Sequence, residues 1–143
     1  MSDDFGRVTA VQKSADGRYE GCIAEGWDIG GVPNGGYVLA IAGRAMAESV
    51  GRPPLSITAH YLAPTRPGPC AIAVEPVRVG GRMATLTASV AQDGRESFRV
   101  LGTFGEGSGA DPILIDGKPP ELPAYDDCAA APPSTPTAAT AGP

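Results

Sequence analysis

The segment WDIGGVPNGGYVLAIAGRAMAESV (residues 27–50) decides the fold. From Tyr37 onward it predicts a helix that is apolar on nearly every side, whereas most surface helices have one apolar stripe and one polar, solvent-exposed face. Only Arg44, Glu48 and Ser49 interrupt the apolar residues, and all three lie near the far end. Such a helix must be enclosed by other parts of the chain.

The boundaries of this helix can be read from the residues on either side of it. Asn34, which follows Pro33, predicts the N-cap. Gly51, followed by Pro53 and Pro54, predicts the C-terminal end. The helix is therefore expected to begin at a Gly-Gly pair.

Alternating strands and tight turns account for most of the remaining sequence. Turn signals at Asp16-Gly17, Gly80-Gly81 and Asp93-Gly94 predict three hairpins, because primed turns need positive φ at their central residues. Strands are expected over residues 8–14, 18–23, 55–62, 70–79, 82–92 and 97–104. Period-two alternation in these strands predicts a sheet with one buried face. The expected fold class is α+β, with an antiparallel sheet wrapped around one long buried helix.

Length and composition limit the classes of function. The chain has 143 residues and a formal net charge of −5, and it has no Lys/Arg cluster, so nucleic acid is not an expected partner. No apolar run approaches the ~18 residues of a membrane span, and the acidic N-terminus is unlike a signal peptide. Three distant cysteines predict reduced thiols in a cytoplasmic protein, with neither a disulfide framework nor a metal site. No cofactor is expected.

Two regions differ in composition. Residues 1–110 carry the predicted helix and strands and are expected to form a single domain. Residues 111–143 are rich in Pro and Ala and show no periodic apolar pattern. We expect these residues to form a linker or a disordered tail.

Several motifs together resemble the N-terminal half of the double hot-dog acyl-CoA thioesterases. They are the helix start Pro33–Tyr37, the strand end His60–Pro64, the Gly-rich hairpin Gly80–Arg82 and the strand end Thr103–Gly105. The resemblance covers roughly residues 5–105. It implies a hot-dog fold, an acyl-CoA substrate and a site at the interface of two hot-dog units. A homodimer or a higher oligomer is therefore expected.

The chain also departs from this family. The family's hydrolytic residues, an acid with a Thr or Ser and a Gln, belong to the second hot dog, which this chain lacks. The first turn of its helix, Gly35-Gly36-Tyr37, carries no carboxylate. The resemblance therefore implies an acyl-CoA site without supplying a complete catalytic set.

The start of the helix is the candidate catalytic centre. Thioester hydrolysis needs stabilisation of an oxyanion, which backbone N–H groups at a helix N-terminus can provide. We expect the amides of Gly35, Gly36 and Tyr37 to act in this way, since the glycines let a thioester approach closely. An equally good interpretation of this segment is that Asn34 caps the helix and the glycines allow the helix to pack tightly against the sheet. Asp28, in the preceding loop, is the candidate to direct water, although a loop Asp is also a common turn former.

Three further residues are candidates for substrate binding. His60, the only histidine, alternates with Thr58 on the strand face opposite Ile57 and Tyr61. There is no Gly-x-Ser-x-Gly motif, so His60 is interpreted as a structural or hydrogen-bonding residue near the substrate. Arg82 is a candidate for the CoA phosphates, although strand arginines often only face solvent.

The sequence therefore favours a thioesterase that hydrolyses an acyl-CoA to the acid and free CoA. The alternative is a non-catalytic acyl-CoA-binding module, or an inactive half of a double hot-dog enzyme. A hot-dog hydratase is disfavoured, because the His of its helix-start signature is missing after Pro33-Asn34-Gly35.

Overall fold

A computed structural model describes residues 4–107, 109 and 117–129. The chain divides into two compact units, residues 1–108 and residues 109–143. In the first unit the elements follow the order α1 (Phe5–Val8), β1 (Val11–Ala15), β2 (Arg18–Ile23), β3 (Asp28–Ile29), β4 (Val32–Pro33), α2 (Gly35–Val50), β5 (Pro54–Tyr61), β6 (Gly68–Val79), β7 (Met83–Gln92) and β8 (Arg95–Gly105). The second unit contains one short 3-10 helix, η1 (Tyr125–Asp127), within its described residues.

Helix α2 begins and ends where the sequence predicts. Asn34 caps its N-terminus, and Gly51 adopts the left-handed conformation at its C-terminus with φ 63°. The buried residues of the helix are Tyr37, Val38, Ile41, Ala42, Gly43, Ala45 and Met46. Arg44, Glu48 and Ser49 are exposed, so the predicted break in the apolar surface is confirmed.

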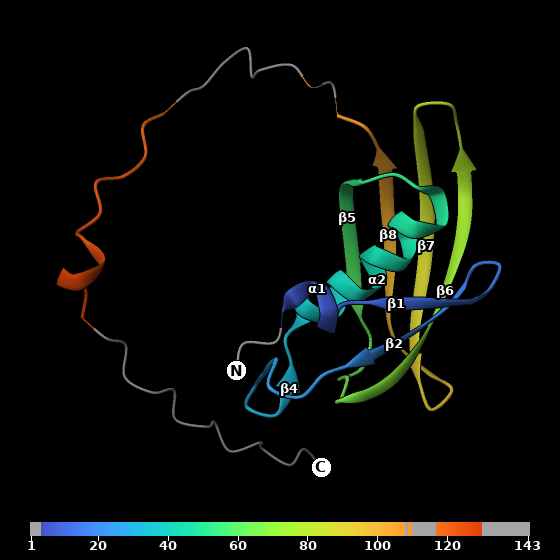
Figure 1. Cartoon of the computed structure of the whole chain (residues 1–143), viewed down its shortest axis with the longest axis horizontal. Coiled ribbons are helices and arrows are strands. Elements are labelled where there is room, and N and C mark those ends of the chain that lie inside the picture. Colours follow the sequence, from blue (N-terminus) through green and yellow to red (C-terminus); the bar gives the residue numbers. More distant parts are fainter. Residues whose placement is uncertain (1–3, 108, 110–116, 130–143) are drawn as a thin grey trace. The chain divides into compact units, whose positions relative to one another are not determined.

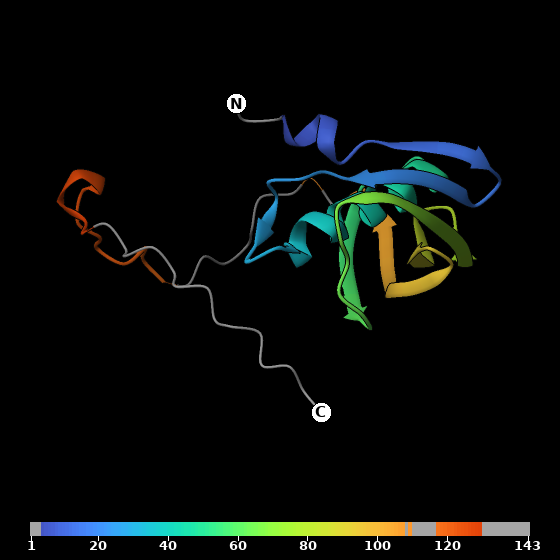
Figure 2. The same ribbon diagram turned by 90° about the horizontal axis from the view of Figure 1, so that it is seen from below.

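A six-stranded antiparallel sheet encloses this helix, in the order β1-β2-β6-β7-β8-β5 (Figures 1 and 2). On β7 the residues facing α2 are Ala84, Leu86, Ala88 and Val90, each at most 3% exposed. Ile57 and Ala59 of β5 pack against the same core. The expected α+β architecture and its alternation are confirmed.

The three predicted hairpins join β1 to β2, β6 to β7 and β7 to β8. Gly17 has φ 65°, and the Asp93-Gly94 turn has φ 50° and 76° at its two residues. Neither Gly80 nor Gly81 has a positive φ, so the β6–β7 hairpin forms where predicted but the primed turn predicted for it was wrong. Gln92 ties the β7–β8 hairpin to the loop before β6, because its amide nitrogen donates to the carbonyl of Arg66 at 2.9 Å and its oxygen accepts from the Arg66 amide at 3.0 Å. Arg66 also forms an ion pair with Asp93.

Two local features differ from the sequence-based prediction. Residues 5–8 form α1 rather than the start of the first strand, because Asp4 accepts a hydrogen bond from the Gly6 amide and the Thr9 hydroxyl bonds back to the Phe5 carbonyl. The prediction of strand from Val8 was therefore wrong. The loop before α2 contains an unpredicted hairpin, β3–β4, whose turn residues Gly30 and Gly31 have φ 63° and 83°.

No helix among the described residues is long and apolar enough to cross a membrane. The predicted Pro/Ala-rich tail lies partly outside the described residues, in 111–116 and 130–143. Within 117–129, the residues whose burial is described are exposed.

Candidate functional site

The N-terminus of α2 is built by Asn34. Its side-chain oxygen Oδ1 accepts hydrogen bonds from the amides of Gly36 at 2.9 Å and Tyr37 at 3.3 Å. The Asn34 amide donates to the carbonyl of Trp27 at 2.8 Å, which fixes the entry of the chain into the helix. The capping role of Asn34 is thus confirmed, and two of the three amides expected to face an oxyanion point to the cap.

Gly35 is the first-turn residue whose amide has no hydrogen-bond partner among residues 4–107. As the first residue of a 16-residue helix, it also lies at the positive end of the helix dipole. The geometry therefore narrows the candidate oxyanion donor from three amides to that of Gly35.

Tyr37 has a structural side chain. It is 3% exposed, its hydroxyl donates to the carbonyl of Val8 at 3.0 Å, and it accepts from the Ala24 amide at 2.8 Å. Its ring stacks on Trp27 with centroids 5.2 Å apart. Tyr37 therefore joins α1 and the end of β2 to the start of α2.

Asp28 lies beside the helix start but serves the β3–β4 turn. Its Oδ1 accepts a hydrogen bond from the Gly31 amide at 3.0 Å, and the residue is exposed. It also lines a hollow of about 390 Å³ together with Trp27, Asn34 and Tyr37. The carboxylate is thus both a turn former and a neighbour of the helix N-terminus.

Tyr61 is a site residue that the sequence reasoning did not select. Its hydroxyl donates to the carbonyl of Gly35 at 2.7 Å. Partial burial raises the pKa of this phenol, so the hydroxyl keeps its proton at neutral pH. The signal that points to it is its position directly after His60, on the strand face shared with Ile57 and Ala59.

An apolar groove opens next to Gly35, with a volume of about 410 Å³. Its lining residues, which define the Gly35 groove, are Val32, Pro33, Gly35, Val38, Tyr61, Leu62, Ala63, Pro64 and Thr65. Val32, Tyr61 and Leu62 are 49%, 52% and 58% exposed. The groove brings a free helix N–H next to an apolar surface, which suits an acyl group with a polar carbonyl end.

The structure does not bring Thr58 and His60 to this groove. Ile57, Ala59 and Tyr61 face α2, so the alternation of β5 places Thr58 and His60 on the opposite, exposed face of the sheet. The prediction that His60 lies opposite Ile57 and Tyr61 is confirmed. Its contact with substrate stays a prediction.

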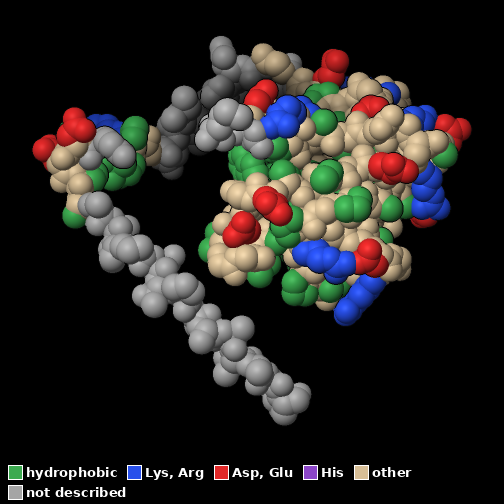
Figure 3. Space-filling view, turned by 60° about the horizontal axis from the view of Figure 1, so that its bottom comes forward, with side chains coloured by type: hydrophobic (Ala, Val, Ile, Leu, Met, Phe, Trp, Pro, Cys, Tyr) green, Lys and Arg blue, Asp and Glu red, His purple; other side chains and the backbone are tan. Residues whose placement is uncertain are grey.

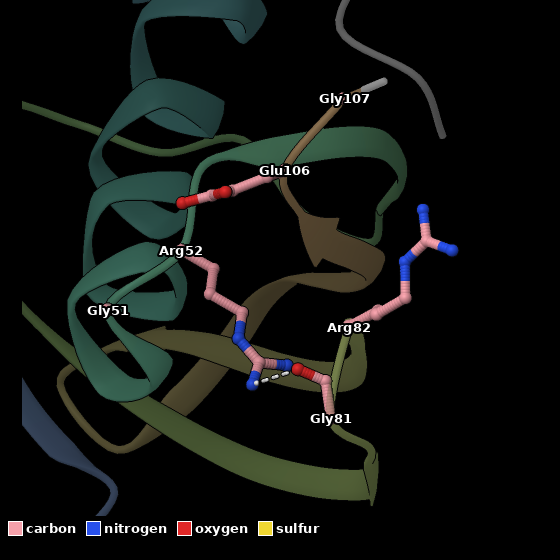
Figure 4. A pocket seen from close by; sticks show the side chains of 6 residues that line it. All are labelled: Gly51, Arg52, Gly81, Arg82, Glu106 and Gly107. Carbon is pink, nitrogen blue, oxygen red and sulfur yellow. Dashed lines mark hydrogen bonds between the residues drawn. The ribbon is translucent and has the colours of Figure 1, made fainter. Parts of the chain in front are cut away.

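Arg82 lies near the other end of the helix. It lines a separate pocket with Gly51, the residue that caps the C-terminus of α2 (Figure 4). The two ends of the 16-residue helix are about 24 Å apart. In Figure 4 the side chain of Arg82 points away from that of Arg52, whose guanidinium donates to the carbonyls of Gly80 at 2.8 Å and Gly81 at 3.2 Å.

The surface shows no basic cluster on the face drawn in Figure 3, where Lys and Arg side chains are interspersed with Asp and Glu. Among the described residues, no group of three or more His, Cys, Asp or Glu is arranged to hold a metal ion. The chemistry available at the Gly35 groove is therefore that of a backbone amide and a phenol hydroxyl, while the Asp28 carboxylate lines a separate hollow on the other side of Asn34 and Tyr37.

The chain is similar in sequence to known thioesterase domains. Residues 23–105 match the family described as acyl-CoA thioesterase N-terminal domain. The thioesterase-like protein TwmA of Talaromyces wortmannii is 32% identical over 94 residues, which are 63% of this chain and 27% of that protein. The chain thus spans about a quarter of the length of this curated relative.

Two solved structures show the same fold. A candidate thioesterase II from Thermobifida fusca superposes with a TM-score of 0.78 at 23% identity, over 83% of this chain and 45% of that chain. A hot-dog protein of unknown function from Alicyclobacillus acidocaldarius gives a TM-score of 0.73 at 20% identity, over 94% of this chain and 52% of that chain. The hot-dog fold expected from the sequence is therefore confirmed, and the chain corresponds to about half of each of these proteins.

Proposed function

Because the chain belongs to the acyl-CoA thioesterase N-terminal domain family, we propose that it hydrolyses an acyl-CoA thioester to the free acid and CoA at the Gly35 groove. The observation that carries the proposal is the position of the Gly35 amide. It is unpaired among residues 4–107 and begins a 16-residue helix, and Gly35 itself lines an apolar groove of about 410 Å³.

In the proposed reaction, the acyl chain lies along the groove and the thioester oxygen accepts a hydrogen bond from the Gly35 amide. A water oxygen bonds to the carbonyl carbon, and negative charge develops on the carbonyl oxygen near the helix N-terminus. The carbon–sulfur bond then breaks, and the departing CoA sulfur takes the proton that Asp28 accepted from the attacking water. Tyr61 holds the Gly35 peptide in place through its carbonyl.

Asp28 is the proposed group that accepts the proton of the attacking water. It is the carboxylate that lines the hollow beside Asn34 and Tyr37, within reach of the start of α2. Its hydrogen bond to the Gly31 amide orients the carboxylate.

A homodimer is part of the proposal. Thr58, His60 and Arg82 lie away from the groove of their own chain, so they can meet a bound acyl-CoA only when a second copy supplies them. The exposed apolar side chains Ile29, Val32, Tyr61 and Leu62 around the groove support such an assembly, since monomers seldom leave such clusters open.

The alternative is acyl-CoA binding without turnover, in a module that needs a second hot-dog unit. The first turn of α2 has no acidic residue, and the candidate carboxylate of Asp28 is already engaged with Gly31. Both observations favour this alternative.

The test is thiol release from acyl-CoAs of increasing chain length by the purified chain. Turnover is expected, and Gly35→Val is expected to abolish it. A Cβ at Gly35 would lie 3.2 Å from the Cζ and hydroxyl oxygen of Tyr61, so a branched side chain there would crowd the Gly35 groove. The control is Gly107→Val, at an exposed position with nothing within 4 Å of a Cβ. Full activity of Gly35→Val would contradict the proposed site, and binding of acyl-CoA without thiol release would favour the alternative.

A further inference from the structure

A second pocket lies between the tip of the β1–β2 hairpin, the end of α2 and strands β6 and β7. It has a volume of about 400 Å³, which lies in the ~300–1,000 Å³ range of ligand pockets. Its apolar walls are Val50, Val74, Pro76, Val79 and Leu86. This pocket, called here the hairpin pocket, shares no lining residue with the Gly35 groove.

The hairpin pocket is preformed, because the tip of the hairpin is fixed to β6. The amide of Val74 donates to the carbonyl of Gly17 at 2.7 Å. Gly17 has φ 65°, and a Cβ there would lie 2.6 Å from the Val74 carbonyl oxygen. The tip of the β1–β2 hairpin therefore approaches β6 as closely as a glycine allows, and the wall of the pocket that it forms has little freedom to move.

Tyr19 supplies the polar group of the pocket. The residue is 2% exposed, and its hydroxyl makes no hydrogen bond within residues 4–107. In the same part of the chain, no fully enclosed side-chain oxygen or nitrogen lacks a partner. The Tyr19 hydroxyl therefore opens onto the hairpin pocket. Burial raises the pKa of this phenol, which keeps the hydroxyl protonated.

The charges around the pocket select the type of head group. Lys13 Nζ is paired with Asp16 Oδ1 at 3.0 Å, so its charge is largely balanced. Glu48 lies near enough to act electrostatically on Tyr19. The lining of the pocket therefore offers no unbalanced positive charge to attract an anionic ligand.

We propose that the hairpin pocket binds a neutral aliphatic alcohol. The tail lies against the apolar walls, and the hydroxyl forms a hydrogen bond with that of Tyr19. This inference goes beyond the proposed thioesterase function and does not depend on it.

The test is a titration of the isotope-labelled full chain with 1-hexanol and hexanoate, followed by amide resonances in NMR spectra. Hexanol is expected to shift the resonances of Gly17, Tyr19 and Val74 at saturation, and hexanoate is expected to bind severalfold more weakly. Shifts confined to Val32 and Leu62 would place the alcohol in the Gly35 groove and overturn the proposal. So would equal binding of the two ligands.

Two variants test the pocket itself. Tyr19→Phe removes only the hydroxyl and is expected to weaken hexanol binding by roughly three- to tenfold. Val79→Trp is expected to fill the pocket and abolish binding. Val79 is 59% exposed, so the larger side chain is compatible with folding. Val77→Trp is the matched control, because Val77 is 63% exposed on the same strand and does not line the pocket. Unchanged affinity in both test variants, or equal loss in Val77→Trp, would overturn the proposal.

Discussion

At the scale of single residues, the candidate site depends on a few hydrogen bonds around one peptide group. The Asn34 side chain accepts hydrogen bonds from the amides of Gly36 and Tyr37, and the Tyr61 hydroxyl donates one to the carbonyl of Gly35. The Gly35 amide is left open because the first residue of a helix has no intrahelical acceptor and the Asn34 side chain accepts from the next two amides instead.

Tyr61→Phe removes the hydrogen bond to the Gly35 carbonyl. We expect the free energy of unfolding to fall by about 1 kcal/mol, measured by urea denaturation. Tyr19→Phe is the matched control, since the Tyr19 hydroxyl has no partner among residues 4–107. Equal changes in the two variants would show that the Tyr61 hydrogen bond contributes nothing to stability.

Asn34→Ala removes the N-cap of α2 and is expected to lower the free energy of unfolding by about 0.5–2 kcal/mol. Asn34→Asp keeps an acceptor for the Gly36 and Tyr37 amides, and its charge suits the helix N-terminus. We therefore expect Asn34→Asp to retain the stability of the unchanged chain in thermal unfolding. A loss as large as that of Asn34→Ala would argue against capping.

Cys70 should resist alkylation in the folded protein. The residue is 5% exposed, and burial raises the pKa of its thiol to about 11, so little thiolate forms at pH 8. Cys22 and Cys128 are exposed and should react quickly. Mass spectrometry after a short pulse of iodoacetamide is expected to show two modified cysteines, and a third only in denaturant. Rapid modification of Cys70 would show that the strands around it open.

At the scale of elements, the contact between α2 and the sheet depends on glycines facing the helix. A Cβ at Gly21 would lie 2.9 Å from Ile41 Cγ2, and one at Gly102 would lie 2.8 Å from Phe104 Cε2 and 3.3 Å from Met46 Cε. Because the core is closely packed, side chains at these positions would force the helix away from the strands. At Gly21 and Gly102 the sheet can therefore pack this closely only because these residues have no side chain.

Gly102→Ala tests this close approach. We expect a loss of roughly 1–3 kcal/mol in the free energy of unfolding, because Phe104 and Met46 are fully buried and have little room to adjust. Gly81→Ala is the control, since a Cβ there meets nothing within 4 Å. Equal stability of the two variants in urea would show that the core can relax around the added methyl group.

At the scale of the whole molecule, the exposed apolar residues around the Gly35 groove connect the proposed activity to assembly. Dimerisation is expected to give twice the monomer mass of 14.5 kDa in light scattering. Leu62→Arg is expected to dissociate the dimer and abolish turnover, because Leu62 lines the groove and is 58% exposed. Val77→Arg is the control, as Val77 is 63% exposed on β6 and lies outside the groove. A Leu62→Arg variant that stays dimeric would place the interface elsewhere.

The sequence alone determined the features that depend on neighbours along the chain. The cap at Asn34, the end at Gly51, the positions of the three hairpins and the alternation of β7 follow from local conformational preferences and from periodicity. The same patterns, together with the motif resemblance, were enough to predict the hot-dog fold. Val8 was misassigned because a four-residue helix is too short to produce a periodic signal.

Only the tertiary structure decided which candidate residues meet. Pairing of β5 with β8, at the edge of the sheet, brings Tyr61 to Gly35 across 26 residues of sequence. The same pairing directs Thr58 and His60 to the other face, while the length of α2 separates Arg82 from the helix start. Such contacts depend on strand order and on the path of the chain between strands, and no local preference encodes either.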